Sequence, residues 1–260
     1  MKRKHYILIA LLIGAAAIAV FMMSAVEELT PSDPLEGSDQ LVLVVSRTGK
    51  SSSAALHMYN RTDDGWKFIF SCSAVIGRNG MGWGRGLHRE SDRVGDDPVK
   101  EEGDGRTPEG AFPLLQAYGY QPPSMVRIDF PYRQVTEDWI CCDDAGSRHY
   151  NKVFDANDKG LDPDDLPSHE DMLRTDDLYK YAVFVGHNVW DTESGAGSCI
   201  FIHLWGGPNS STAGCTAISE EHMLTLLSEL DSEKNPVMVA LSRRNYLRLK
   251  EIWGLPDITI

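Results

Sequence analysis

A cysteine and a histidine twelve residues apart are the residues of this chain best suited to chemistry. Cys215 follows Gly214 at the end of a glycine-rich loop, and His203 lies on the apolar stretch before that loop. A thiol within hydrogen-bonding reach of an imidazole becomes a good nucleophile, because the thiolate is stabilised beside a histidinium. The N–H groups of Gly214 and Cys215 could then hold an oxyanion. The pattern therefore predicts nucleophilic cysteine chemistry without a metal or another cofactor.

The apolar stretch 199–205 (CIFIHLW) predicts the strand that must present the histidine. Alternation puts three aliphatic side chains on one face, which belongs to the core. His203 lies on the opposite, mixed face near the end of the strand, together with Trp205. We therefore expect a cleft at this end of the strand, with Trp205 either as its wall or as an ordinary packing aromatic.

Simpler interpretations of the same residues stay open. A cysteine beside glycine can serve packing alone, and a histidine on a strand can be structural. A metal site would need a third or fourth ligand, which His187 and Cys199 could supply, although the chain has no C-x-x-C or H-x-x-x-H pair.

The composition narrows the class of protein and of partner. With 42% hydrophobic and 24% charged residues among 260, the chain has the make-up of a soluble globular domain. Its formal net charge is −13, and no run of lysine or arginine occurs beyond the N-terminus. Binding to nucleic acid needs a basic face, so nucleic acid is excluded as the partner.

The N-terminus predicts export. Basic residues in the first four positions precede an apolar stretch, 6–23, that is 18 residues long. This length suits a membrane anchor, whereas the alanines at 17 and 19 also fit signal cleavage. Residues 1–25 are therefore expected to be a cleaved signal peptide or an uncleaved anchor, and either way the domain reaches the periplasm or cell envelope. Residues 26–40 are predicted as a polar linker and residues 41–260 as one catalytic domain.

Five cysteines in an exported protein leave at least one thiol unpaired. Cys141 and Cys142 are adjacent, so a bridge between them would be strained. Cys72 and Cys199 lie in apolar stretches that are typical of packing cysteines. We therefore do not expect disulfides to be the main source of stability, and the odd thiol is a functional candidate.

The rest of the chain predicts a mainly β or α+β domain. One principal helix is expected after the nucleophile, over 220–231, with Ser219 as its N-cap, and a short helix is expected at 243–253. The buried stripe of the principal helix is Met223, Leu226, Leu227 and Leu230. The predicted strands are 41–46, a hairpin over 54–77, 125–130, 181–188, 199–205 and 236–242.

Two segments predict loops. Residues 78–110 are rich in Gly, Arg and Asp with little hydrophobic periodicity, as functional or disordered loops are. The acidic segment 155–177 invites comparison with a calcium-binding loop, but Lys159 and Leu166 stand where ligands belong. We therefore interpret it as a solvated surface loop.

The segments GSCIFIHLW and STAGCTAIS, around His203 and Cys215, resemble the catalytic signature of the L,D-transpeptidase (YkuD-like) family. Further blocks extend the resemblance over roughly residues 70–240, as in a divergent branch of that family. These blocks are AVIGRNGMGWG, EGDGRTPEGAFPLLQAYGY, CDDAGSRHYN and DDLYKYAVFVGHN.

The resemblance implies a β-sandwich-type catalytic domain and cysteine acyl transfer on peptidoglycan stem peptides. It makes Cys215 the nucleophile and His203 its general base. The carbonyl of Leu204 would orient the ring, and the N–H groups of Gly214 and Cys215 would hold the oxyanion. The sulfur would attack the carbonyl of the third residue of a tetrapeptide stem, expel D-Ala and pass the acyl group to an amine or to water. The candidate substrate contacts are His187, Asn188, Trp205, Arg106 and Thr212.

This chain departs from the family pattern around the nucleophile. Ala213 precedes Gly-Cys, and Thr216 and Ala217 follow it, where the family more often has basic or amide side chains. The spacing from histidine to cysteine is also shorter, so substrate contacts are expected to differ. Three alternatives to the transpeptidase stay open: a cysteine carboxypeptidase or amidase, a non-catalytic wall-binding protein on the same fold, and a metal-dependent hydrolase.

Overall fold

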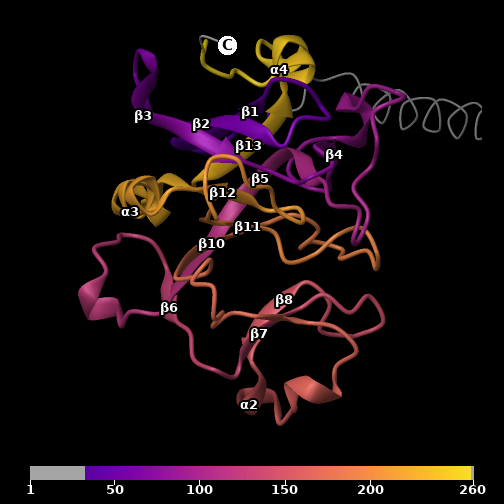
Figure 1. Cartoon of the computed structure of the whole chain (residues 1–260). Coiled ribbons are helices and arrows are strands. Elements are labelled where there is room, and N and C mark those ends of the chain that lie inside the picture. Colours follow the sequence, from indigo (N-terminus) through magenta and orange to yellow (C-terminus); the bar gives the residue numbers. More distant parts are fainter. Residues whose placement is uncertain (1–32, 259–260) are drawn as a thin grey trace, which may run out of the picture. The chain divides into compact units, whose positions relative to one another are not determined.

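The computed structural model describes residues 33–258, which form one compact unit from Pro34 onward. Thirteen β-strands lie within this part of the chain (Figure 1). They are β1 (Gln40–Ser46), β2 (Ser53–Thr62), β3 (Gly65–Val75), β4 (Met81–Trp83), β5 (Thr107–Gly119), β6 (Tyr132–Gln134), β7 (Trp139–Cys142), β8 (Lys152–Asp155), β9 (Glu170–Asp171), β10 (Tyr181–Val185), β11 (Phe201–Leu204), β12 (Thr216–Ile218) and β13 (Val237–Ser242).

Helices are few in the same residues, so the prediction of a mainly β or α+β domain is confirmed. The α-helices are α2 (Ala156–Lys159), α3 (Glu220–Glu229) and α4 (Arg243–Leu249). Single-turn 3-10 helices are η1 (Glu90–Asp92), η2 (Pro123–Met125), η3 (Pro163–Asp165) and η4 (Ser232–Lys234).

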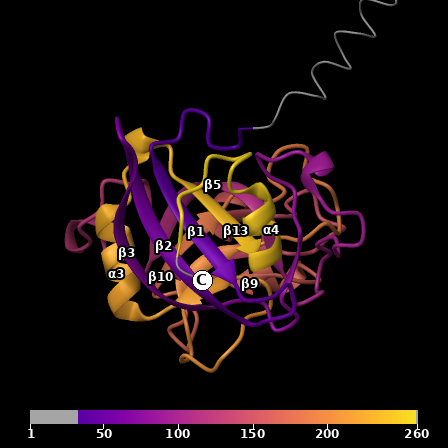
Figure 2. The same cartoon turned by 90° about the horizontal axis from the view of Figure 1, so that it is seen from above.

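The large sheet curls until its two ends meet. Its strands run in the order β10-β11-β12-β3-β2-β1-β13-β5-β4, and β10 pairs with β5 as well as with β11. Pairing between β3 and β12 is limited to Val75 and Ala217, so this is the shortest ladder of the circuit. Figure 2 shows β1, β2 and β3 as a curved layer beside β13. His203 on β11 and Cys215, which immediately precedes β12, therefore lie close to this weakly paired junction.

Alternation along β1 divides the core into two clusters. Val42 and Val44 face a cluster that α3 helps to build, whereas Leu41, Leu43 and Val45 face a second cluster that includes α4. Every residue of β1 is buried, because the sheet is covered on both faces here. Figure 1 accordingly shows α3 and α4 on opposite sides of the central strands.

Helix α3 confirms the helix expected after the nucleophile. The Ser219 side chain accepts a hydrogen bond from the His222 N–H and caps the helix as predicted. Burial of each large apolar side chain stabilises the fold by roughly 1.5–3 kcal/mol. The predicted stripe is buried in full: Met223, Leu226, Leu227 and Leu230. The hairpin β2–β3, the strands β1 and β13 and the helix α4 confirm further predictions.

A small second sheet, in the order β8-β7-β9, lies between β6 and β10 in the chain and at the bottom of Figure 1. A disulfide between Cys141 of β7 and Cys199 joins it to the large sheet. The prediction of Cys199 as a packing cysteine inside a strand is wrong, because this residue precedes β11 and has a φ of 54°. The left-handed backbone there turns the chain before the strand begins.

One predicted strand and one predicted segment boundary differ from the structure. Residues 125–130 form no strand, because Met125 belongs to the 3-10 turn η2, which Pro122 and Pro123 begin, and only Asp129 makes an isolated bridge, to Asp231. The linker predicted to reach residue 40 ends earlier, since Leu35 is only 1% exposed in the core on the α4 side.

The predicted signal peptide or anchor, residues 1–25 with the apolar stretch 6–23, lies outside the described residues. Between residues 33 and 258 no helix has the length and apolarity to cross a membrane. The same residues contain no group of three or more His, Cys, Asp or Glu side chains arranged to hold a metal ion.

Candidate active site

The parallel pairing of β11 with β12 brings the cysteine to the histidine. His203 lies opposite Ala217 in this ladder. Side chains alternate along both strands, so Cys215, two residues before Ala217, points to the same face as His203. The predicted alternation is confirmed, because Phe201 and Cys215 lie in one buried cluster and Ile202 lies in another.

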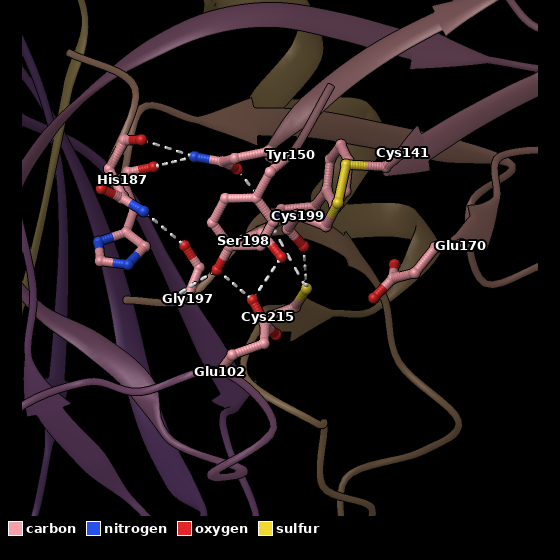
Figure 3. Close-up of a disulfide and its surroundings, with 12 residues drawn as sticks. Glu102, Cys141, Tyr150, Glu170, His187, Gly197, Ser198, Cys199 and Cys215 are labelled. Atoms are coloured by element: carbon pink, nitrogen blue, oxygen red, sulfur yellow. Dashed lines mark hydrogen bonds between the residues drawn. A yellow bond between two sulfur atoms is a disulfide. The ribbon is translucent and has the colours of Figure 1, made fainter. Parts of the chain in front are cut away.

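Backbone groups hold the Cys215 sulfur. The Phe201 N–H donates a hydrogen bond to Sγ at 3.3 Å, and the thiol donates to the Cys199 carbonyl at 3.5 Å (Figure 3). Cys215 is only 7% exposed. Burial raises the pKa of the thiol to about 12, and the negative charge of Glu170 raises it as well. The resting nucleophile is therefore a neutral thiol.

The His203 ring is held in one tautomer. Nδ1 donates a hydrogen bond to the Leu204 carbonyl at 2.7 Å, and this bond orients the ring. A carbonyl can only accept, so the proton is on Nδ1 and the lone pair is on Nε2. Burial lowers the pKa of the ring to about 4, and the nearby cation of Arg174 also lowers it. Cys215 and His203 are thus both neutral at rest, which corrects the expectation of a thiolate beside a histidinium.

Cys215 and His203 line one cavity of about 250 Å³. Trp205 and Thr212, two of the predicted substrate contacts, also line it, so Trp205 does form part of the cavity wall. Glu170, Arg174 and Tyr179, which the sequence did not single out, are also part of the wall. The volume approaches that of small-molecule sites, so a substrate group can enter beside the sulfur.

The loop before the nucleophile determines which oxyanion donor is open. The Thr212 hydroxyl donates to the Cys215 carbonyl at 2.6 Å and accepts the Gly214 N–H at 3.2 Å. The Thr107 hydroxyl also donates to the Cys215 carbonyl, at 3.1 Å. The predicted donor Gly214 N–H is therefore occupied, whereas the Cys215 N–H has no acceptor within residues 33–258.

Arg106, a predicted substrate contact, serves the scaffold instead. Its guanidinium donates to the carbonyls of Asn79 and Met81, at 2.8 and 3.2 Å. A Cβ at position 214 would come to 3.0 Å from the Arg106 carbonyl oxygen, and glycine permits this close approach. The backbone at Arg106 therefore supports the loop of the nucleophile from behind.

His187 and Asn188, predicted as substrate contacts, lie in a buried network outside the cavity. His187 accepts the Arg85 N–H at Nδ1 (3.2 Å) and donates from Nε2 to the Ala196 carbonyl (3.0 Å). Burial lowers the pKa of this ring to about 3, so it stays neutral. The Asn188 side chain donates to the Glu193 carbonyl and accepts the Glu193 N–H, each at 2.9 Å. Both residues thus fix the segment that leads toward the disulfide.

The disulfide places an unexpected carboxyl group in the cavity. Cys141 lies opposite Glu170 in the β7–β9 pair, and the bridge from Cys141 to Cys199 fastens this pair beside the sulfur. Figure 3 shows the Glu170 carboxyl directed toward Cys215. Glu170 Oε2 shares a 2.5 Å hydrogen bond with the hydroxyl of Tyr179. The active-site wall is therefore built partly by the small sheet.

Glu170 belongs to the acidic segment 155–177, for which the loop prediction is only partly right. The segment contains α2, η3 and β9, and Met172 is fully buried. No local pattern marks Glu170 or Tyr179 as a site residue, because both reach the cavity through long-range pairing.

Comparison with known proteins identifies the domain type. Residues 42–239 match the family model of the YkuD L,D-transpeptidase catalytic domain. No curated protein matches the chain. Similar solved structures include Bd1075 from Bdellovibrio bacteriovorus, with 13% identity and a TM-score of 0.36. They also include the helical cell shape determining protein Pgp2 from Campylobacter jejuni, with 15% identity and a TM-score of 0.37.

Both of these structures are longer than the part that this chain matches. Each alignment covers 78% of this chain and 48% of the other, so the chain spans about half the length of these two proteins.

Proposed function

We propose that this chain is a cysteine acyltransferase acting on the peptide stems of peptidoglycan, because it belongs to the L,D-transpeptidase (YkuD) catalytic-domain family. The observation that carries the proposal is the cavity that Cys215 and His203 share, together with the hydrogen bond from Nδ1 to the Leu204 carbonyl, which makes Nε2 the basic nitrogen of the ring. The reaction proposed is L,D-transpeptidation, in which D-Ala leaves the third residue of a tetrapeptide stem.

The neutral resting pair implies that attack and proton transfer occur together. As Sγ of Cys215 bonds to the substrate carbonyl carbon, its proton passes to Nε2 of His203, so no free thiolate has to form in the buried site. The Leu204 carbonyl stabilises the resulting imidazolium through Nδ1. The carbonyl oxygen becomes an oxyanion, for which the Cys215 N–H is the open donor.

The tetrahedral intermediate then collapses to a thioester. The C–N bond breaks, and the leaving amine of D-Ala takes the proton from His203. An amine of a second stem next attacks the thioester carbonyl, and His203 accepts its proton while the Cys215 sulfur leaves. Sulfur recovers this proton, so the enzyme returns to its neutral resting pair.

We also propose that the domain works in the periplasm or cell envelope. The predicted export segment at residues 1–25 supports this location. So does the buried bridge between Cys141 and Cys199, because disulfides form and persist in oxidising compartments.

Intact mass spectrometry of the full chain after incubation with a tetrapeptide donor tests the proposal. The wild type should gain the mass of the donor without D-Ala, and Cys215→Ala should gain nothing. Cys72→Ala, which removes another buried free thiol, is the matched control and should keep the adduct. The proposal fails if the wild type forms no adduct or if the adduct persists without Cys215.

The products released in the same incubation identify the acceptor. Crosslinked stem dimers are the expected result, because the proposed acceptor is an amine. Trimmed monomers alone would replace transpeptidation by hydrolysis while leaving the acyl-enzyme chemistry of Cys215 intact.

A further inference from the structure

We propose that Glu170 is a proton-gated positioning residue, which sets the direction of the Tyr179 hydroxyl and thereby the reactivity of Cys215. The geometry that points to it is the 2.5 Å hydrogen bond between Glu170 Oε2 and the Tyr179 hydroxyl, inside the wall of the catalytic cavity. The inference rests on the proposed function for the reaction in which this reactivity is used.

The phenol of Tyr179 is fixed, so only its proton can move. Its ring lies edge-on to His203, with 5.1 Å between the ring centroids, and 5.2 Å from Phe201. The guanidinium of Arg174 lies over its ring at 5.1 Å from the centroid. Tyr179 is only 5% exposed. Glu170 is held on its side by the β7 ladder and the disulfide.

The protonation state of Glu170 decides what the Tyr179 hydroxyl can do. An ionised carboxylate only accepts, so it takes the single O–H of the tyrosine. A neutral carboxyl can donate its own proton to the phenol oxygen, which leaves the tyrosine O–H free to turn into the cavity. The neutral state holds one more proton, which Glu170 takes up from solvent, and the direction of the hydrogen bond to Tyr179 reverses as a result.

Cys215 responds to both members of this pair. The Glu170 charge raises the pKa of the thiol, second only to burial, while the nearby Tyr179 hydroxyl lowers it. The neutral form of Glu170 therefore increases the reactivity of Cys215 in two ways. It removes a negative charge that opposes the thiolate, and it frees the Tyr179 hydroxyl to donate a hydrogen bond to the developing anion.

Both states of Glu170 are populated near neutral pH. Burial raises its pKa to about 7, with the Asp143 and Glu102 carboxylates raising it too, while the Tyr179 hydrogen bond and Arg174 lower it. The other groups of the cavity do not titrate in this range, because His203 and Cys215 have pKa values of about 4 and about 12. On the same short strand, Oδ1 of Asp171 lies 3.3 Å from Nε2 of His169.

The rate of Cys215 alkylation by iodoacetamide, from about pH 5.5 to about pH 8.5, tests the gate on both sides of the Glu170 pKa. Peptide mass mapping assigns the modified thiol. Alkylation ordinarily rises about tenfold per pH unit below the thiol pKa, because only the thiolate reacts. We expect the wild-type rise to flatten near pH 7 and that of Glu170→Gln to keep one slope. At pH 8.5 the variant should react on the order of tenfold faster than the wild type.

Matched variants separate the gate from a general effect on structure. The glutamine amide donates to the phenol oxygen as a neutral carboxyl would. His169→Asn and Asp171→Asn alter neighbours on the same segment and should keep the wild-type profile. Tyr179→Phe should react more slowly than the wild type at about pH 6 and converge with it at about pH 8.5, where Glu170 already occupies the hydroxyl.

Two outcomes overturn the inference. One is a wild-type profile with a single slope across the whole range, which needs no variant to interpret. The other is a Glu170→Gln profile parallel to that of the wild type. Because iodoacetamide needs no peptide substrate, a confirmed gate without an acyl adduct would refute only the proposed function.

Discussion

Reduction of the Cys141–Cys199 disulfide should lower the free energy of unfolding by about 4 kcal/mol. The two cysteines are separated by 58 residues in the sequence. In the chain-entropy description, a crosslink over that distance removes roughly 14 cal/mol/K from the unfolded chain, which is about 4 kcal/mol at 25 °C. Both cysteines are almost completely buried, and the bridge is the covalent joint between the small sheet and the segment before β11.

Urea unfolding of the full chain with and without reductant measures this difference, with mass spectrometry reporting the redox state. The variant Cys141→Ala/Cys199→Ala should unfold at one urea concentration in both conditions, which assigns the effect of reductant to this bridge. Cys142→Ala changes the neighbouring free thiol and should keep the full sensitivity to reductant. A loss below about 1 kcal/mol on complete reduction would refute the reasoning, because loop closure over this length could not then be restraining the unfolded chain.

Three further outcomes follow from the buried polar groups. As the pH is lowered, the acylation rate should fall only near pH 4, because the base must be neutral and burial holds the pKa of His203 at about 4. The pH profile of kcat/KM measures this, and a fall centred near pH 6.5 would contradict it. Lowering the pH from about 6.5 toward 4 should remove the contribution of His187 and His203 to the free energy of unfolding, because the unfolded chain binds protons at these residues that the folded chain refuses, while the raised pKa of Glu170 acts in the opposite direction. In urea titrations His187→Gln should therefore lose less stability than the wild type over this range, and an equal loss would count against it. Tyr150→Phe should lower the free energy of unfolding by about 1–3 kcal/mol, because the lost hydroxyl donates a hydrogen bond to Glu102 at 2.5 Å and accepts one from the Gly197 N–H at 3.0 Å. An unchanged free energy in urea unfolding would show that Glu102 and Gly197 find other hydrogen-bond partners.

The meeting of His203 and Cys215 in one cavity could be predicted because it depends on local patterns. Alternation along 199–205 is a property of consecutive residues, and it correctly puts His203 opposite the aliphatic face. The cap at Ser219 and the stripe of α3 are local in the same sense. These features form from neighbouring residues, so they depend little on how distant strands pair.

The remainder of the site depends on contacts that no local pattern contains. Glu170 reaches the cavity through the β7–β9 pair and a bridge between residues 58 positions apart. Residue type alone also gave the wrong role to Arg106 and His187, because a sequence does not reveal that neighbouring backbone groups already use their hydrogen-bonding capacity. The alternation of 125–130 misled for a related reason, since the segment has no partner strand and makes only an isolated bridge at Asp129.

The protonated state of the Cys215 sulfur bears on how long the protein survives among oxidants. Thiolates attack peroxide and foreign disulfides far more readily than thiols do, and the first product with peroxide is a sulfenic acid. A sulfur that keeps its proton until a carbonyl arrives reacts slowly with such reagents, although a disulfide-bonded residue, Cys199, touches it. The slow reactivity of the resting thiol thus protects it against oxidants. This protection ends when a substrate binds, because the substrate carbonyl is what makes the sulfur give up its proton.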